Sequence, residues 1–205
     1  MRKITALEVQ KKDNNRVNVY VDGEFFCGVS IDTVAKHYLR MGMELTDDQL
    51  EQVREDSGER DMFAKAIDYI MRSPRTRREM VNYLTRKGCD SELAERLVDK
   101  LVAEGFVNDG DYAKMFVDAK AKKMGKNQLR AKLTYRGVSG EDLAEALGNV
   151  DNDEQLESAR EYAEKYMRGR ERDLKTLQKL YRHLINKGFE FDMCSTVVEE
   201  VRSAE

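Results

Sequence analysis

Tyr83-Leu84-Thr85-Arg86-Lys87-Gly88-Cys89 is the first of three similar stretches that decide the fold of this chain. The other two are Lys132-Leu133-Thr134-Tyr135-Arg136-Gly137-Val138 and His183-Leu184-Ile185-Asn186-Lys187-Gly188-Phe189. Their glycines lie 49 and 51 positions apart, and each follows a basic residue and precedes an apolar one. This ending is typical of a helix that stops at a glycine in the left-handed conformation. The spacing therefore predicts three repeated units of about 50 residues each.

Matching helical segments lie on both sides of each glycine. Upstream, aromatic and alanine positions recur in residues 66–69, 111–116 and 162–166. Downstream, leucine or valine recurs at helical spacing in residues 93–101, 143–147 and 197–201. Repeats of this period bury their apolar faces against their neighbours. We therefore expect a mainly α fold, in which three tandem three-helix units form an elongated array.

Local patterns predict where some of these helices begin. Thr76-x-x-Glu79 predicts a capping box at the second helix of the first unit, and Ser139-x-x-Asp142 predicts a weaker one in the second unit. The run Asn108-Asp109-Gly110-Asp111 predicts the joint between these two units, with Asp109 as the N-cap.

The start of the chain differs, because only this part has strand patterns. The predicted strands are Ile4–Val9, Arg16–Val21 and Glu24–Val29. Asp22-Gly23 lies between the last two and predicts a type I′ turn, so we expect a three-stranded meander. Two short helices, Ile31–Met41 and Thr46–Asp56, are predicted to follow, the second with the capping-box pattern Thr46-x-x-Gln49. The polar run Glu55–Asp61 is predicted to be a linker. The expected domains are residues 1–60, 61–108, 109–152 and 153–205.

The charge of the chain is nearly balanced overall but not locally. It has 36 Lys and Arg against 39 Asp and Glu, a net charge of −3. Residues 62–137 carry a net +7, whereas residues 1–61 carry −4 and residues 138–205 carry −6. Because local charge sets the field near a surface, the basic middle predicts an anionic partner such as nucleic acid.

Several other classes of protein are disfavoured by the sequence. No apolar run approaches the roughly 18 residues of a membrane span, and no secretory signal is visible. The three cysteines are odd in number and widely spaced, which argues for a reducing cytoplasm. Neither His37 nor His183 has a partner at metal-ligand spacing, and no phosphate-binding glycine loop occurs. We expect a cytoplasmic, non-enzymatic protein without a metal or a cofactor.

Basic residues around the second helices of the first two units form the candidate partner-binding site. The planar fork of arginine suits phosphate and carboxylate groups. We expect Lys126, Arg130, Lys132 and Arg136 to lie along one side of a helix. The alternative is a solvated face neutralised by nearby acids, and it fits the third unit better because acids are interleaved there. The candidates are Arg75, Arg77, Arg78, Arg86, Lys87, Lys120, Lys122, Lys123, Lys126, Arg130, Lys132 and Arg136.

The aromatic residues allow two interpretations. They recur at equivalent places in the repeat, beside leucine and alanine, which favours a role in the core. Exposed aromatics can instead stack on nucleobases. Tyr135, beside Arg136, is the candidate for exposure.

Three groups of residues carry a likeness to a known family. They are Thr76-x-x-Glu79-Met80-x-x-Tyr83-Leu84-x-x-Lys87-Gly88, Gly105-Phe106-Val107-Asn108-Asp109-x-x-Tyr112-Ala113-x-x-Phe116, and Lys123-x-Gly125 followed by Leu129, Leu133 and Arg136-Gly137. In these groups, which span about residues 62–190, the chain resembles the RecX regulatory proteins, bacterial modulators of the recombinase RecA. The resemblance implies tandem three-helix units that bind the RecA–single-stranded DNA filament. It implies that they lower filament growth, ATP hydrolysis, strand exchange and co-protease activity, and so modulate recombination, DNA repair and the SOS response.

Two alternatives remain open at this point. The three-helix units also resemble helix-turn-helix arrangements, so the protein could bind DNA directly, without RecA. A general helical scaffold for another protein is the third possibility. In each case we expect a monomer that contacts no membrane.

Overall fold

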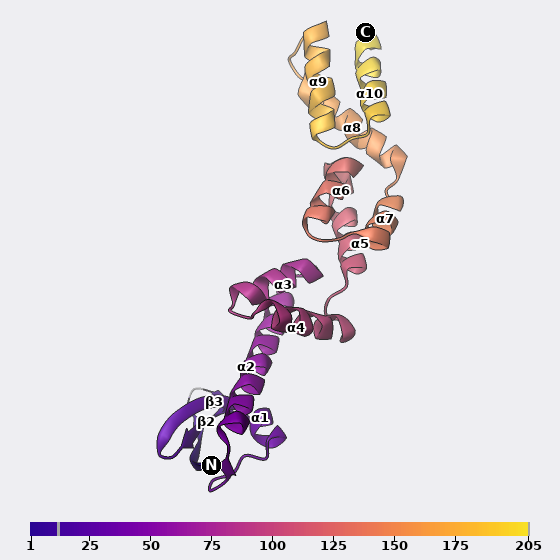
Figure 1. The fold of residues 1–205 in the computed structure, drawn as a ribbon. Helices are drawn as coiled ribbons and strands as arrows, with labels where there is room; N and C mark the ends of the chain where they lie inside the picture. Colours follow the sequence, from indigo (N-terminus) through magenta and orange to yellow (C-terminus); the bar gives the residue numbers. More distant parts are fainter. Residues whose placement is uncertain (12, 205) are drawn as a thin grey trace. The chain divides into compact units, whose positions relative to one another are not determined.

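A small antiparallel sheet begins the chain in the computed structural model, which describes residues 1–11 and 13–204 (Figure 1). Its strands are β1 (Arg2–Gln10), β2 (Asp13–Val21), β3 (Glu24–Ser30) and β4 (Glu44–Leu45), in the order β3-β2-β1-β4. The predicted three-stranded meander is confirmed. Asp22 and Gly23 both have positive φ, 53° and 88°, as a type I′ turn requires. The fourth strand, which pairs with the start of β1, is too short for a sequence pattern to predict.

The first helix, α1 (Ile31–Lys36), is shorter than predicted. It ends five residues before Met41, because Tyr38 adopts a left-handed conformation with φ of 52°. The amide of Leu39 then bonds back to the carbonyl oxygen of Val34, at 2.9 Å, and the Leu39 side chain is buried. The helix therefore ends where the chain turns to bury the Leu39 side chain.

The second helix, α2 (Asp47–Ile70), is much longer than predicted. Its capping box between Thr46 and Gln49 is confirmed, but the predicted linker Glu55–Asp61 is wrong, because the helix runs through it. Ser57 in this segment is buried and donates a hydrogen bond to the carbonyl oxygen of Gly28 on β3, at 3.3 Å. Asp61 pairs with Arg16 on β2. These contacts with the sheet keep the polar segment helical.

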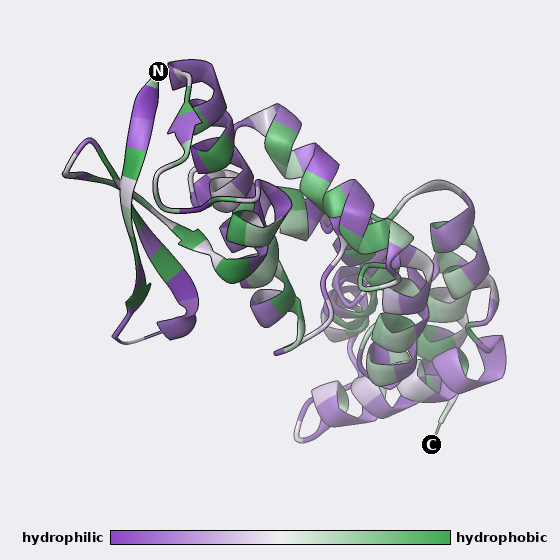
Figure 2. Cartoon of the chain, turned by 90° about the horizontal axis from the view of Figure 1, so that it is seen from below, coloured by the Kyte–Doolittle hydropathy of each residue, from purple (hydrophilic) through white to green (hydrophobic). Residues whose placement is uncertain are grey.

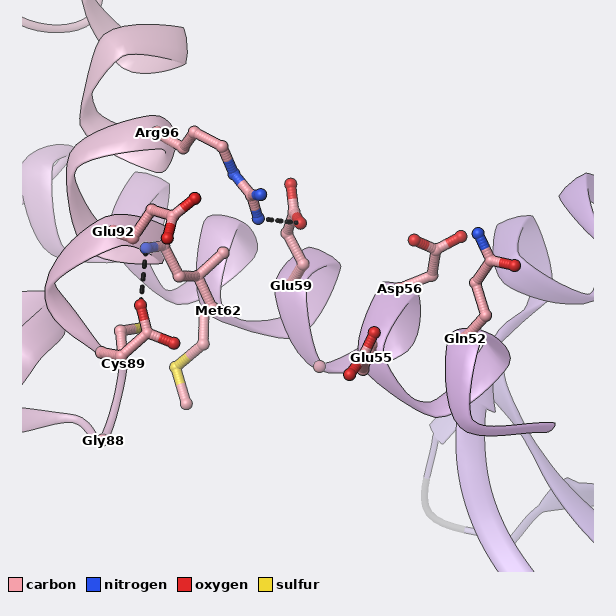
Figure 3. Close-up of a pocket in the computed structure, with 12 residues that line it drawn as sticks. Gln52, Glu55, Asp56, Glu59, Met62, Gly88, Cys89, Glu92 and Arg96 are labelled. Carbon is pink, nitrogen blue, oxygen red and sulfur yellow. Dashed lines mark hydrogen bonds and ion pairs between the residues drawn. The ribbon is translucent and has the colours of Figure 1, made fainter. Parts of the chain in front are cut away.

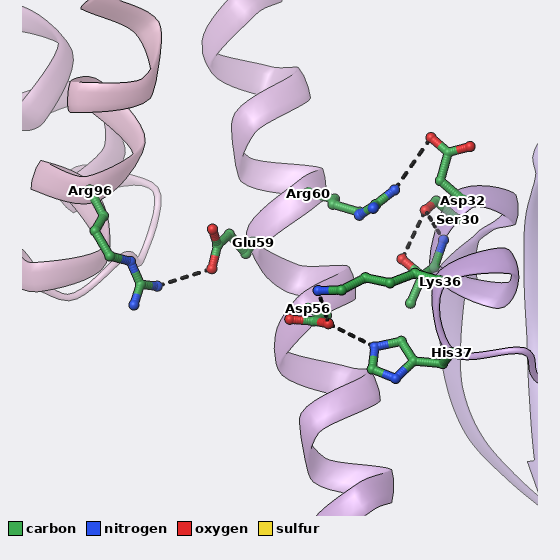
Figure 4. Close-up of polar contacts among 9 residues, drawn as sticks. Ser30, Asp32, Lys36, His37, Asp56, Glu59, Arg60 and Arg96 are labelled. Atoms are coloured by element: carbon green, nitrogen blue, oxygen red, sulfur yellow. Dashed lines mark hydrogen bonds and ion pairs between the residues drawn. The ribbon is translucent and has the colours of Figure 1, made fainter. Parts of the chain in front are cut away.

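Polar contacts also attach α1 to the middle of α2 (Figure 4). Asp56 of α2 accepts a hydrogen bond from Lys36 Nζ at 2.5 Å and lies 2.7 Å from His37 Nε2. One turn further, Arg60 pairs with Asp32 at 3.4 Å. The hydrogen bond from Lys36 lowers the pKa of the Asp56 carboxyl. The ionised form of Asp56 is therefore the one that holds these elements together.

Tandem three-helix units make up the rest of the described chain. The first unit combines the end of α2 with α3 (Arg77–Arg86) and α4 (Ser91–Ala103). The second contains α5 (Asp109–Lys120), the 3₁₀ turn η1 (Ala121–Lys123), α6 (Lys126–Tyr135) and α7 (Gly140–Gly148). The third contains α8 (Asn152–Met167), α9 (Leu174–Asn186) and α10 (Phe191–Ser203). The predicted fold class, mainly helical with tandem three-helix repeats after an N-terminal sheet, is confirmed.

Each second helix ends as the repeat predicts. Gly88, Gly137 and Gly188 have φ of 100°, 97° and 89°, and the following residue in each case is buried. Hydrophilic and hydrophobic residues alternate along the helices, as the purple and green bands of Figure 2 show. In the second unit the core is built from residues such as Leu129, Leu133 and Leu147, and in the third from Leu180, Leu184 and others. The apolar spacing therefore marks the buried faces correctly.

The helix starts give mixed outcomes. Thr76 and Glu79 form the predicted capping box, with both hydrogen bonds at 3.2 Å. The predicted box at Ser139 is wrong, because its side chain makes no capping hydrogen bond. The N-cap of α5 is Asn108 rather than Asp109: the Asn108 side chain accepts from the amide of Asp111 at 3.1 Å. Asp109 instead accepts a hydrogen bond from the backbone amide of Arg77.

By its internal contacts the chain divides into two parts. The first part holds residues 1–73 and 80–106, and the second holds residues 74–79 and the chain from residue 107. The first turn of α3 therefore belongs to the second part, where it packs against the second three-helix unit. Across the described residues, every helix is too short or too polar to cross a membrane.

Candidate functional site

The first turn of α3 docks onto the glycine turn that ends α6. Thr76 Oγ1 donates to the carbonyl oxygen of Arg136 at 2.6 Å, and the amide of Arg77 donates to Asp109 Oδ1 at 2.7 Å. Burial raises the pKa of this Asp109 carboxyl. Across the same contact, Arg136 pairs with Glu79 at 3.3 Å. Asp109 thus joins two units rather than capping its own helix.

The first turn of α6 docks in the same way onto the glycine turn that ends α9. The amides of Gly125 and Asn127 donate to the carbonyl oxygens of Lys187 and Gly188, both at 2.9 Å. Gln128 Nε2 donates to the carbonyl oxygen of Asn186 at 3.3 Å. In both joints, the positive start of one second helix meets the negative end of the next, which helix dipoles favour.

A buried glutamine supports the second joint. Gln155 of α8 accepts from the amide of Lys126 at 3.1 Å and donates to the carbonyl oxygen of Ala121 at 2.6 Å. It therefore bonds backbone groups on both sides of the break before α6. Sequence patterns do not distinguish this glutamine from those on the surface, so its role was not predictable.

Arg136, a predicted partner-binding residue, lies inside the first joint. Its side chain is half-buried and pairs with Glu79. The guanidinium lies 5.3 Å from the ring centroid of Phe116 and 5.7 Å from that of Tyr112, and it bonds the Tyr112 hydroxyl. These contacts give Arg136 a structural role that the count of basic residues did not indicate.

The other predicted residues of α6 lie on two faces rather than one. Successive residues turn by about 100° around a helix, so Lys126 and Arg130 flank the buried stripe of α6 on one side. Lys132 and Arg136 flank it on the other, and the expectation of a single basic side is wrong. Lys120, Lys122 and Lys123 lie just before α6, around η1, with Lys122 and Lys123 exposed.

Most of these cations form no ion pair among the described residues. Within the described part of the chain, no ion pair involves Arg78, Lys120, Lys122, Lys123, Lys126, Arg130 or Lys132. The cations of a self-neutralised helix face would be paired, as Lys114 is with Glu145 at 2.9 Å. Their charge therefore remains available to an anionic partner.

Tyr135 gives this basic surface an exposed aromatic ring. Its side chain is 79% exposed, which confirms the expectation for this residue. The guanidinium of Arg78 lies 5.7 Å from its ring centroid. Lys132 precedes Tyr135 by three positions and so lies on the same side of α6. Exposed aromatic rings beside cations are common in proteins that bind single-stranded nucleic acids.

The remaining predicted residues lie apart from this surface or are partly covered. Arg75 and Arg77 are half-buried beside the first joint. Arg86 and Lys87 are exposed at the end of α3, in the first part of the chain. There Lys87 Nζ lies 5.7 Å from the ring centroid of Tyr83, which stacks on Tyr69 with centroids 3.9 Å apart.

One group of basic residues lies outside the predicted set. Lys175, Lys179 and Arg182 are exposed on α9, in the unit whose acids led to the opposite expectation. The segment 174–186 contains no acidic residue, and that absence is the sequence signal that points to them.

A hollow in the first part of the chain has the opposite charge (Figure 3). It measures about 570 Å³ and lies between the middle of α2 and the start of α4. Its lining includes five acids and one arginine: Glu55, Asp56, Glu59, Asp90, Glu92 and Arg96. Arg96 is paired with Glu59 at 3.0 Å. Such a lining repels an anionic partner, so the basic surface is the better candidate.

The remaining reactive residue types have structural surroundings. Burial raises the pKa of the Cys27 and Cys194 thiols to about 11, and it also raises that of Cys89. Thiols with raised pKa are poor nucleophiles at neutral pH. Among the described residues, no group of three or more His, Cys, Asp and Glu side chains is arranged to hold a metal ion.

Four domain models of one family match the chain in succession. "Regulatory protein RecX N-terminal domain" matches residues 2–46, and "RecX, first three-helix domain" matches residues 63–101. The second and third three-helix domains of RecX match residues 108–147 and 153–198. The matches follow the order of the sheet and the three helical units described above.

Two individual relatives match this chain along its whole length. A regulatory protein RecX from Clostridium botulinum is 32% identical over 209 residues, which cover 100% of this chain and 99% of the relative. One from Clostridium perfringens is 30% identical over 213 residues, with coverage of 100% and 99%.

The fold is shared with two crystal structures. One, of a regulatory protein RecX, has a TM-score of 0.81 at 24% identity and covers 97% of this chain and 100% of that one. The other, of RecX from Lactobacillus salivarius, has a TM-score of 0.63 at 23% identity, with coverage of 69% and 95%. The identity to whole relatives and the four successive domain matches establish the family, and the shared fold agrees with them. The chain belongs to the RecX family of regulatory proteins.

Proposed function

We propose that this protein binds the RecA–single-stranded DNA filament and inhibits RecA. The inhibited processes are filament growth, ATP hydrolysis, strand exchange and co-protease activity, so the protein modulates recombination, DNA repair and the SOS response. One observation carries the proposal in a chain of this family: successive three-helix units present cations that no acid of the described chain neutralises. A filament that contains single-stranded DNA is an anionic polymer with many equivalent sites, which such a surface fits.

Repeated weak contacts supply the affinity. Each unit binds with few charges, but the joint at Gly137 holds the first turn of α3 to the second unit, and the joint at Gly188 holds the second unit to the third. Once one unit is bound, the next has a high effective concentration at the neighbouring site. A chain with net charge −3 can therefore bind a polyanion, because the field at the basic surface differs from the average.

The protein acts by binding rather than by catalysis, as a monomer in the cytoplasm. A monomer is consistent with a repeat protein whose units pack against one another within one chain. Light scattering during size-exclusion chromatography tests this part: a dimer at working concentrations would contradict it.

The test of inhibition is the ATP hydrolysis that RecA performs on single-stranded DNA. We expect the added protein to lower the rate and shorten the filaments seen by electron microscopy. A variant with Arg78, Lys122, Lys123 and Arg130 all replaced by alanine should inhibit less. The matched control replaces four paired cations, Lys100, Lys114, Lys165 and Arg202, and loses the same charge. Unchanged hydrolysis and filament length at a stoichiometric excess of wild-type protein would refute the proposal.

Direct DNA binding without RecA is the second candidate, favoured by the exposed Tyr135 beside Arg78. It predicts tight binding to free DNA with a steep salt dependence, and no effect on RecA beyond competition for DNA. If excess DNA abolishes the inhibition completely, this second function is the primary one.

A further inference from the structure

The outward face of α9 carries a line of three cations. Successive residues of a helix are rotated by about 100° around its axis. Relative to Lys175, Lys179 therefore lies near 40° and Arg182 near −20°, so the three side chains share a sector of about 60°. The buried residues Leu180 and Leu184 lie on the opposite side of the helix. The line is about 10 Å long, because each residue advances about 1.5 Å along the axis.

Most acids of this unit lie on the other two helices, and several of them are paired there. On α8 and α10, Glu161 pairs with Lys165 at 3.2 Å, and Glu200 pairs with Arg160 at 2.6 Å. Asp173 precedes α9 and caps it, accepting from the amide of Thr176 at 2.8 Å. In the described chain, no ion pair reaches the three cations of α9. Asp173 also attracts Lys175 and Lys179 electrostatically without forming an ion pair with either, so it offsets only part of the charge of this face.

The second joint connects α9 with α6. At the end of α9, the carbonyl oxygen of Asn186 accepts from Gln128 Nε2 at 3.3 Å. Lys132 lies one turn beyond Gln128 on the same side of α6, and Tyr135 follows it. The ring of Tyr135 then meets the guanidinium of Arg78. These contacts connect the end of α9 with the side of α6 that carries Lys132 and Tyr135, and that side with Arg78 in the first turn of α3.

We infer that the outward face of α9 binds the phosphate backbone of single-stranded nucleic acid, in line with Lys132, Tyr135 and Arg78. This inference rests on the proposed function, in which the protein binds a filament that contains single-stranded DNA. It names the DNA strand, rather than the protein of the filament, as what the third unit contacts.

The composition of the face favours nucleic acid over an acidic protein surface. Protein interfaces have an apolar core and are depleted in lysine, whereas here two of three cations are lysines. The exposed apolar residue of this helix, Leu174, lies about 100° around the axis from Lys175. Cations spaced along a line, with an exposed aromatic further on, are the pattern of proteins that follow a single strand.

The experiment measures the anisotropy of a fluorescein-labelled oligothymidine as salt rises from about 50 to 200 mM. A single strand contributes a slope of about −0.7 in log K against log salt for each phosphate contacted. Replacing Lys175, Lys179 and Arg182 by alanine should reduce the slope by about 2. Over this fourfold change in salt, wild-type affinity should fall about 20-fold more than the affinity of the variant.

The matched control replaces Lys165, Arg168 and Arg202, which are exposed in the same unit but paired with acids. It should keep the wild-type slope, and circular dichroism should show both variants folded. The inference is overturned if the α9 variant keeps the wild-type slope, or if wild-type protein does not bind the oligothymidine. It is also overturned if the variant loses inhibition of RecA while its slope is unchanged, because α9 then contacts protein. Because DNA binding is measured without RecA, the assay still tests the α9 face if the proposed inhibition of RecA proves wrong.

Discussion

Replacing Gly125 with alanine should break the joint between the second and third three-helix units. A Cβ at this position would overlap the backbone of Gly188, which is not the end of a flexible side chain and cannot move aside. The φ of Gly125 is −71°, so alanine is compatible with the local backbone. The effect of the substitution therefore comes from the clash at the joint and not from strain in the helix start.

The magnitude follows from the bonds that the clash would separate. Gly125 and Asn127 each donate a backbone hydrogen bond across the joint, at 2.9 Å, and the Gln128 side chain donates a third. Each such bond contributes about 0.5–1.5 kcal/mol net. Losing all three should lower the free energy of unfolding by about 3 kcal/mol.

Urea unfolding followed by far-ultraviolet circular dichroism measures this change. The control is Gly148→Ala, because a Cβ there meets no atom within 4 Å and Gly148 lies in helix α7. Alanine has the higher helix propensity, so this control should be neutral or slightly stabilising. If Gly125→Ala unfolds at the same urea concentration as wild type, the joint does not stabilise the fold as argued.

Three further changes have defined outcomes. Tyr135→Ala should weaken binding to oligothymidine by about 1–3 kcal/mol in an anisotropy titration, whereas Tyr135→Phe should not. Thr76→Val removes a hydroxyl that accepts from the Glu79 amide and donates across the first joint, and should cost about 1–2 kcal/mol in urea unfolding. Asp56→Asn should destabilise the protein at neutral pH, because the folded state lowers the pKa of Asp56 through its hydrogen bond from Lys36. The stabilisation from a lowered carboxyl pKa is fully present above the unfolded value of about 3.9 and is lost as pH falls through the lower, folded value. The difference in stability between wild type and variant should therefore begin to shrink below about pH 4 and vanish at still lower pH. A constant difference across that range would contradict the assignment.

Features set by a few neighbouring residues were predictable from the sequence. A positive φ at Gly23 or Gly88 depends on the missing side chain and the residues beside it. The capping box at Thr46 likewise needs only a side chain and an amide three positions away. The repeat of the glycine turns then gives the order of the three-helix units, because each turn marks the end of a second helix.

Features that depend on distant contacts were not predictable. The polar run Glu55–Asp61 has the composition of a linker, yet Ser57 bonds the sheet and the segment stays helical. Asp109 has the right residue type for an N-cap, but it accepts from Arg77, 32 positions earlier. Counting charge by block also hid the face of α9, because most acids of the third unit lie on the neighbouring helices.

The joints connect the stability of the fold with the binding of a polyanion. Arg78, Lys132 and the cations of α9 are connected only because each glycine turn receives the start of the preceding second helix. Gly125→Ala removes no charge, but it should loosen the joint that aligns the third unit with the second. The effective concentration of α9 at the neighbouring phosphates would then fall, and affinity for a long oligothymidine should fall with it. Affinity for an oligonucleotide too short to reach both units should not change, which separates lost alignment from lost charge.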